Sequence, residues 1–170
     1  MEDSISGMIE LRLITDADVV AVKNWPAYTD IFEAMDYALR EDGWLDEYRK
    51  RPITWIYMAE LGGQTVGFSL LSTTADKEAE FRVAVHPQWI GKGLGSHIAV
   101  ETLKKGFFQL NLTRIHLIVR KENPIALKLY EGIGFIKYGE STHAIQGKPI
   151  EFIDMDMSRE KFISAKKEEG

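Results

Sequence analysis

A glycine-rich segment in the middle of the chain has the residue types of a phosphate-binding turn. Val83–Val85 has the pattern of a strand end, and Gly91, Gly93 and Gly95 follow it just before an apolar helical stripe. The first N–H groups of a helix lack partners within the helix and carry the positive end of its dipole. Glycine allows a ligand to approach the backbone closely and adopts positive φ at little cost. The segment therefore predicts either a site for a phosphate-bearing ligand or a tight structural turn.

Two other phosphate-binding motifs do not fit this sequence. The dinucleotide fingerprint G-x-G-x-x-G, started at Gly91, needs glycine at position 96, where Ser96 stands. The acidic ribose ligand expected about 20 residues further on is also missing, because Asn111–Arg114 contains no carboxylate. No G-x-x-x-x-G-K-[ST] run occurs. These mismatches argue against a nucleotide-binding oxidoreductase or a P-loop enzyme.

A second segment, Arg120–Phe135, contains the pattern N-x-x-A-x-x-L-Y-x-x-x-G-F. Asn123 is a good helix N-cap, and Pro124 suits the first helical position. Gly134 can close the helix in a left-handed conformation. On these grounds alone the segment is a well-capped helix, with Tyr130 facing the core.

Together the two segments resemble the GCN5-related N-acetyltransferase (GNAT) superfamily over Glu78–Tyr138. The family's loop Q/R-x-x-G-x-G/A falls on Ile90–Gly95, with Ile90 in place of the usual Arg or Gln. The resemblance implies that this loop binds the pyrophosphate of acetyl-CoA, with CoA as product. The cofactor-binding residues that it implies are Val83, Val85, Ile90, Gly91, Lys92, Gly93, Leu94, Gly95, Ser96, Asn123, Ala126 and Tyr130.

The implied reaction transfers an acetyl group to a primary amine. Tyr130 would lie near the cofactor sulfur, and a tyrosine hydroxyl of ordinary pKa near 10 can protonate a departing thiolate. Glu80 is the candidate general base, directly or through water, and Glu78 is the alternative, on the same face of a regular strand. Both carboxylates could equally belong to a solvated strand edge. The chain has no cysteine, which favours direct attack in a ternary complex over a covalent relay.

The acceptor cannot be named from the sequence, and three kinds fit: a small amine, an antibiotic amine, or a protein N-terminus or lysine. The aromatic residues of 24–52 predict an acceptor pocket or a part of the core, and residues 141–149 form a second acceptor loop. The tentative pocket residues are Trp25, Tyr28, Tyr37 and Trp44. A different class of function, a non-catalytic CoA-binding sensor or partner-binding domain, also fits the resemblance.

The elements that position these residues are predicted from periodicity and turn signals. Strands are expected at 8–14, 55–61, 65–71, 80–85, 114–119, 135–138 and 150–157. Helices are expected after Thr15 with Ala17, Val20 and Ala21 on the buried side, in one or two pieces within 24–52, from the glycine loop to 108, and at 124–131. The C-terminal residues 159–170 are expected to be charged and frayed.

This order of elements predicts one α/β domain over residues 1–170, with its core at about 8–158. The resemblance implies a single-domain acyl-CoA N-acyltransferase (GNAT-like) fold. It has a mixed, mostly antiparallel sheet of six to seven strands, about four flanking helices and a V-shaped split between the central strands.

Composition narrows the choice of partners. The formal net charge of −5 argues against a nucleic-acid partner and weakly favours cationic acceptors. No apolar run is long enough to cross a membrane, and the acidic N-terminus is unlike a secretory signal, so a cytoplasmic location is expected. His86, His97, His116 and His143 lack metal-ligand spacing and are interpreted as structural or surface residues, with no metal site expected. The family often dimerises, which makes a homodimer possible.

Overall fold

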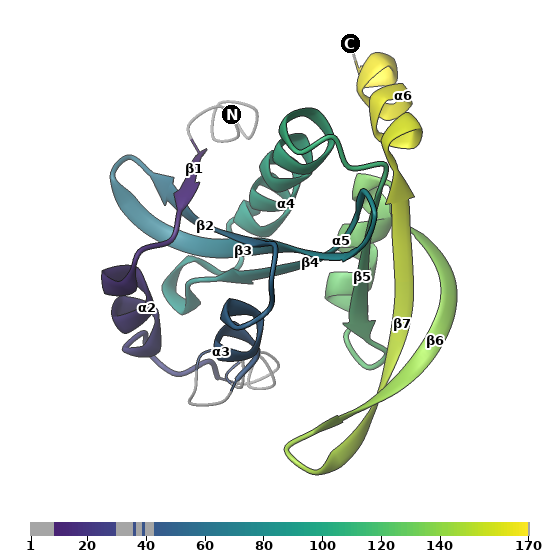
Figure 1. Cartoon of the computed structure of the whole chain (residues 1–170). Coiled ribbons are helices and arrows are strands. Elements are labelled where there is room, and N and C mark those ends of the chain that lie inside the picture. The colour runs from purple at the N-terminus through teal and green to yellow at the C-terminus, as the bar shows by residue number, and fades with distance from the viewer. Residues whose placement is uncertain (1–8, 30–35, 37–38, 40–42, 170) are drawn as a thin grey trace. The chain divides into compact units, whose positions relative to one another are not determined.

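The computed structural model describes residues 9–29, 36, 39 and 43–169 (Figure 1). The chain divides into two compact units: unit 1 comprises Met1–Thr73 and Arg82–Leu103, and unit 2 comprises Thr74–Phe81 and Lys104–Gly170. Seven strands are hydrogen-bonded in the order β1-β2-β3-β4-β5-β7-β6. The predicted mixed α/β sheet is therefore confirmed, whereas the assignment of residues 1–170 to one domain stays a prediction.

The strands are β1 (Ile9–Leu13), β2 (Thr54–Leu61), β3 (Gln64–Ala75), β4 (Glu78–Val85), β5 (Arg114–Arg120), β6 (Ile136–Ile145) and β7 (Lys148–Ser158). The helices of the described part are α2 (Asp16–Lys23), α3 (Trp44–Arg49), α4 (Leu94–Lys104), α5 (Pro124–Ile133) and α6 (Arg159–Glu169). A 3-10 turn at Pro87–Trp89 precedes α4, and a π-helical turn at Lys105–Gln109 follows it.

Helix α2 begins where its capping residues predict. The Thr15 side chain accepts a hydrogen bond from the backbone N–H of Asp18, and Asp18 in turn accepts one from the backbone N–H of Thr15. The predicted buried face was wrong. Val19 and Val22 are buried. Val20 is 63% exposed, and Ala17 and Ala21 are also exposed. Four apolar residues in a row gave the pattern two possible faces, and packing in unit 1 selected one of them.

The hairpin β2–β3 turns at Gly62 and Gly63, as predicted, and both residues have positive φ (59° and 83°). Its register shifts between Ala59 and Glu60, so that one extra residue, Val66, interrupts the pairing on β3. Such a bulge breaks the regular alternation of side chains along a strand. Accordingly Val66 and Phe68, two residues apart, belong to different clusters of the core.

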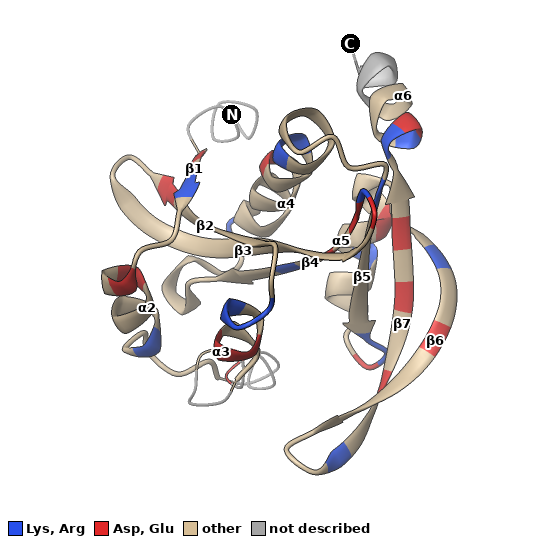
Figure 2. Ribbon diagram, in the orientation of Figure 1, with Lys and Arg blue, Asp and Glu red and all other residues tan. Residues whose placement is uncertain are grey.

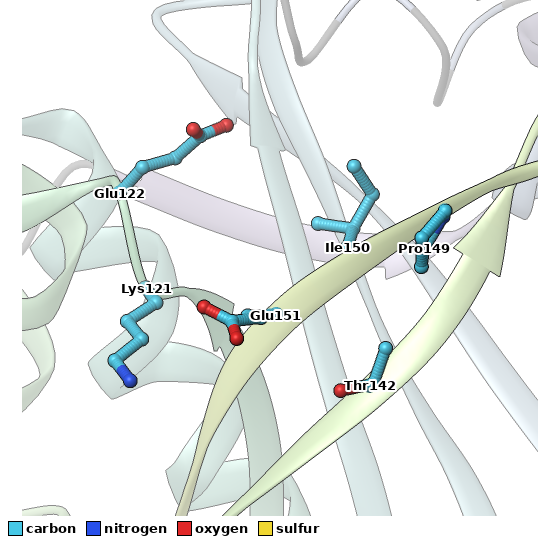
Figure 3. A pocket seen from close by; sticks show the side chains of 6 residues that line it. All are labelled: Lys121, Glu122, Thr142, Pro149, Ile150 and Glu151. Atoms are coloured by element: carbon cyan, nitrogen blue, oxygen red, sulfur yellow. The ribbon is translucent and has the colours of Figure 1, made fainter.

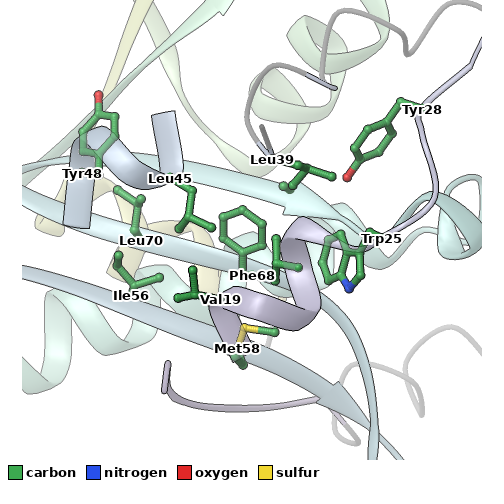
Figure 4. Close-up of a cluster of buried hydrophobic side chains, with 12 residues drawn as sticks. Val19, Trp25, Tyr28, Leu39, Leu45, Tyr48, Ile56, Met58, Phe68 and Leu70 are labelled. Atoms are coloured by element: carbon green, nitrogen blue, oxygen red, sulfur yellow. The ribbon is translucent and has the colours of Figure 1, made fainter. Parts of the chain in front are cut away.

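Two apolar clusters lie among the described residues of unit 1. The larger one, drawn in Figure 4, packs α2 and α3 on strands β2 and β3. Its buried members are Val19, Val22, Trp25, Tyr28, Leu39, Leu45, Tyr48, Ile56, Met58, Phe68, Leu70 and Ala84. The second cluster packs Leu94 and Ile98 of α4 on Ile9, Ala59 and Val66. Helix α4 is therefore fixed to the strands by its first turn, directly after the glycine loop.

Strands β5 and β7 of unit 2 each have one apolar and one polar face. Buried and half-buried residues alternate along β5, and β7 buries Ile153, Met155 and Met157. Between them on β7 lie Asp154 and Asp156, which are half-buried. Figure 2 shows these acidic positions along β7.

Two predictions for the C-terminal part of unit 2 were wrong. The strand expected at 135–138 continues to Ile145, and β6 and β7 form a long hairpin. Residues 141–145 and 148–149 are paired, and only Gln146 and Gly147 form a turn. Residues 159–169 form helix α6 rather than a frayed end, because Phe162 is buried and its ring lies 5.3 Å from that of Phe107. In the described part of the chain, no helix is long and apolar enough to span a membrane.

Candidate active site

The glycine loop of unit 1 has the predicted conformation. Gly91 and Gly93 have positive φ (86° and 77°), and a Cβ added at either would meet no atom within 4 Å. Both glycines and Lys92 are exposed, so the loop presents its backbone to solvent just before α4. The Ser96 hydroxyl donates to the carbonyl of Gly93 at 3.1 Å and closes the turn. This loop can accommodate a pyrophosphate at the N–H groups of the first turn.

The side chains on either side of these glycines have structural roles. Ile90 packs against the larger apolar cluster of unit 1, which explains an apolar residue where the family has Arg or Gln. Leu94 is buried in the second cluster and can offer a ligand only its backbone. Val83 and Val85 pack beside the same cluster, and the Val85 carbonyl accepts a hydrogen bond of 2.5 Å from the Tyr28 hydroxyl.

The aromatic residues predicted as an acceptor pocket lie in the core of unit 1. Trp25 and Tyr28 are 8% and 3% exposed, and the Trp25 ring lies 5.9 Å from Phe68 and 4.7 Å from His86. Trp44, half-buried, lies 5.3 Å from Phe68 (Figure 4 shows the cluster). Tyr37 lies outside the described residues. The structure thus supports the core interpretation for these three rings, and their role toward an acceptor stays a prediction.

Helix α5 of unit 2 is capped as predicted. The Asn123 side chain accepts a hydrogen bond from the N–H of Ala126 at 3.1 Å, and Pro124 occupies the first turn. At the other end the N–H groups of Gly134 and Phe135 both donate to the carbonyl of Tyr130 (3.2 and 3.0 Å). The side-chain oxygen of Asn123 therefore already has a structural partner. The two hydrogen bonds to its carbonyl fix the backbone of Tyr130 at the end of the helix.

The Tyr130 side chain is half-buried between two phenylalanines. Its ring lies 6.3 Å from Phe81 and 5.9 Å from Phe135, edge-on to both. These contacts fix the ring through its apolar edges. The contacts do not decide between a general acid and a tyrosine that only packs in the core, so the general-acid role stays a prediction.

The two candidate bases differ in their surroundings. Glu78 accepts a hydrogen bond of 2.9 Å from Arg114, which also donates to Asp156 at 2.8 Å, so Glu78 belongs to an ion-pair group. Glu80 is 9% exposed and lies beside His116 in the parallel pairing of β4 and β5. Of the two, Glu80 is the better candidate for proton transfer.

The parallel pairing of β4 and β5 in unit 2 comprises Glu78–Glu80 with Arg114–His116. It ends at Glu80 and His116, although β5 continues to Arg120 and β4 to Val85. The V-shaped split between central strands that the resemblance implies stays a prediction.

A hollow of ≈ 400 Å³ opens in unit 2 beside the turn after β5 (Figure 3). It is lined by Lys121, Glu122, Thr142, Pro149, Ile150 and Glu151. Lys121 forms an ion pair with Glu140 at 2.8 Å. The sequence did not predict this hollow, because the residues that line it come from three separate segments. Only two of them, Thr142 and Pro149, lie in the predicted acceptor loop.

The glycine loop, the capped helix and the strand order are the features that comparison with known proteins can test. The model of the acetyltransferase (GNAT) family matches residues 3–135. The chain belongs to the acetyltransferase (GNAT) family. This membership confirms the predicted family and fold.

Among individual relatives, this GNAT chain is similar to spermidine N(1)-acetyltransferases. It is 31% identical to that of Escherichia coli K12 over 118 residues, 67% of this chain and 63% of the relative. The relative from Vibrio cholerae is 40% identical over 63 residues, 37% of this chain and 36% of that protein. The matched part of the chain thus spans less than two thirds of these relatives.

Solved structures agree with this fold. A chimera of the spermidine N-acetyltransferase SpeG from Vibrio cholerae and hSSAT superimposes with a TM-score of 0.76 and 25% identity, over 92% of this chain and 99% of that one. The Vibrio cholerae enzyme in complex with CoA and spermine gives 0.72 at 22% identity, covering 92% of this chain and 99% of that one. The second likeness concerns the fold alone.

Proposed function

We propose that this chain transfers an acetyl group from acetyl-CoA to a primary amine, and that the amine belongs to a polyamine of the spermidine type. The observation that carries the proposal is the GNAT family match over residues 3–135, which includes the glycine loop with its two positive-φ glycines. The polyamine is suggested by the spermidine N(1)-acetyltransferases among its relatives.

The charge of the chain supports a cationic acceptor. The formal net charge is −5, and the carboxylates of Glu78, Glu80, Asp154 and Asp156 lie on one face of the strands of unit 2. Two more carboxylates, Glu122 and Glu151, line the hollow beside the turn after β5. A polyamine carries several positive charges, so a mainly acidic face raises its local concentration.

In this proposal each functional group of the chain has one role. Acetyl-CoA supplies a thioester whose carbonyl carbon the amine attacks. Glu80 removes a proton from the ammonium group, directly or through a water molecule. Tyr130 donates its hydroxyl proton to the departing sulfur. The backbone of Val83 and Val85 and the loop at 90–96 hold the cofactor.

The two proton-transferring groups lie on opposite faces of β4. Successive side chains of a strand point to opposite faces, so Glu80 and Phe81 face away from each other. The Tyr130 ring contacts Phe81 on the apolar face, whereas the Glu80 side chain lies on the polar face. In the proposed reaction the acceptor reaches Glu80 from the polar face.

The proposal is tested by following thiol release from acetyl-CoA in the presence of single acceptors. Spermidine, spermine, an aminoglycoside and a lysine-containing peptide are compared at equal concentration. We expect the highest kcat/KM with spermidine or spermine. Faster turnover of the aminoglycoside or the peptide would contradict the polyamine assignment while leaving the enzyme class intact. Binding of acetyl-CoA without turnover of any amine would favour a CoA-binding sensor.

A further inference from the structure

The last paired rung of β4 and β5 brings a histidine beside the candidate base. Glu80 and His116 are register partners in adjacent parallel strands, which lie about 4.8 Å apart. His116 Nε2 forms a hydrogen bond of 2.8 Å with the Thr74 hydroxyl, so its ring orientation is fixed from β3. All three residues belong to unit 2, and the pairing of the two strands ends at this rung.

Charged groups from every neighbouring strand face this histidine. Arg114 lies two residues before it on β5, and Asp156 is its register partner on β7. Burial lowers the pKa of His116, and the positive charge of Arg114 lowers it further. Glu80, Glu78 and Asp156 act in the opposite direction but do not outweigh burial. The Arg114 guanidinium lies over the Tyr138 ring of β6, 5.1 Å from the ring centre. The imidazole is therefore neutral and able to accept a proton at pH 7.

A carboxylate alone is a weak acceptor for an amine proton. The ordinary pKa of glutamate is about 4.3, that of histidine about 6.5 and that of an alkyl ammonium group about 10.4. An ordinary imidazole thus holds a proton better than an ordinary carboxylate does. A neutral imidazole beside the carboxylate reduces the free-energy cost of keeping the acceptor amine neutral.

We propose that His116 receives the acceptor's proton from Glu80, so that the two residues form a proton-transfer pair. This inference rests on the proposed function. The ammonium N–H bond breaks and an O–H bond forms on Glu80; that bond then breaks as the proton moves to an imidazole nitrogen of His116. Glu80 returns to its carboxylate form and stabilises the adjacent imidazolium, which later loses the proton to solvent. Thr74 holds the ring in place throughout.

The test measures kcat against pH for the wild type and for His116→Gln, with spermidine and saturating acetyl-CoA. The wild type should lose activity as pH falls through a midpoint below 6.5. His116→Gln should lower kcat about 10²-fold at pH 7 and abolish that midpoint. Exposed Gln109, at the end of the π-helical turn after α4, provides the control: Gln109→Ala should leave both quantities unchanged.

Two further measurements separate proton transfer from a structural role. Added imidazole should restore part of the activity of His116→Ala and have no effect on the wild type. The pKa of His116, read from its NMR resonance without cofactor, should fall in Glu80→Gln, because a carboxylate that stabilises the imidazolium has been removed. A lower kcat with an unchanged pH midpoint and no rescue by imidazole would overturn the pair. An unchanged kcat in His116→Gln would also overturn it, and an inactive wild type would instead remove the proposed function on which it rests.

Discussion

At the scale of single residues, the proposed reaction depends most on the hydroxyl of Tyr130. Its ring is held edge-on by Phe81 and Phe135, contacts that phenylalanine would keep. Tyr130→Phe should therefore lower kcat about 10²-fold through loss of the acid alone. The affinity for acetyl-CoA, measured by calorimetry, should remain within about twofold of the wild type.

The control for this substitution is Tyr57→Phe, which removes a hydroxyl from buried Tyr57 on β2 of unit 1. Its kcat should equal that of the wild type. If Tyr130→Phe kept full activity as well, the hydroxyl would have no part in the reaction and another donor would have to protonate the thiolate.

A second residue-scale prediction concerns acid stability. Arg12 donates two hydrogen bonds to Asp18 (2.6 and 2.9 Å), and with the capping bonds of Thr15 they lower the pKa of Asp18 to about 2. A carboxyl with a pKa below its unfolded value, about 3.9, stabilises the fold above that value. This contribution should be complete above about pH 4 and should decline as pH falls toward 2.

Urea unfolding of the wild type and Asp18→Asn checks this point. The difference between their free energies of unfolding should be constant from pH 5 to pH 7 and should shrink below about pH 4. A difference that stayed constant down to pH 2 would mean that the ion pair with Arg12 does not persist in solution.

At the scale of elements, the glycine loop before α4 should be sensitive to a single methyl group. An L-residue at φ 77° is strained by about 1–3 kcal/mol, so Gly93→Ala should shift the loop and weaken acetyl-CoA binding about tenfold. Gly63→Ala, at φ 83° in the β2–β3 turn, carries comparable strain away from the loop. Calorimetric titration should show weaker acetyl-CoA binding only for Gly93→Ala. An equal loss of affinity in both variants would mean that the substitutions act through general destabilisation of the fold.

The β3 bulge makes a separate prediction about stability. A Cβ at Gly67 would lie 2.7 Å from the Ala84 carbonyl oxygen and 2.9 Å from Ile98, and a backbone oxygen cannot move aside cheaply. Gly67→Ala should therefore destabilise the fold by about 1–3 kcal/mol. Gly132→Ala, at an open position of helix α5, should instead be neutral or stabilising by up to about 1 kcal/mol. Chemical denaturation would distinguish them, and equal effects would argue against the close approach at Gly67.

Features of this fold that depend on neighbouring residues were predictable. Thr15 with Asp18, Gly62 with Gly63, and Asn123 with Gly134 each mark a helix end or a turn through local hydrogen bonds or φ angles. The length of β6 was not predictable, because its mostly exposed, polar residues lack strand alternation and form a strand only by pairing with β7. Long-range pairing of this kind leaves little trace in a local window.

The residues of the candidate site also fall into those that local sequence predicts and those that depend on long-range packing. The residues of the glycine loop and of α5 were found through their spacing, whereas the role of Trp25 and Tyr28 depends on packing against residues far along the chain. His116 was interpreted as structural or surface, because its relation to Glu80 exists only in the parallel register of β4 and β5. The two lie 36 positions apart in sequence, and no spacing rule connects them.

At the scale of the whole molecule, membership in the GNAT family and the net negative charge both support a cationic acceptor. In the proposed function the family match suggests the class of reaction, and a formal net charge of −5 favours a cationic amine over an anionic one. Attraction between exposed charges is screened by salt over about 8–10 Å at physiological ionic strength. The KM for spermidine should therefore rise with ionic strength, while kcat changes little.

The most direct test of the account is to identify the product by mass spectrometry after the purified protein has been incubated with acetyl-CoA and spermidine. We predict spermidine carrying one acetyl group on a primary amine, formed together with an equal amount of CoA. Unmodified spermidine, in a protein that acetyl-CoA still stabilises against heat, would contradict the proposed activity and identify the chain as a CoA-binding domain.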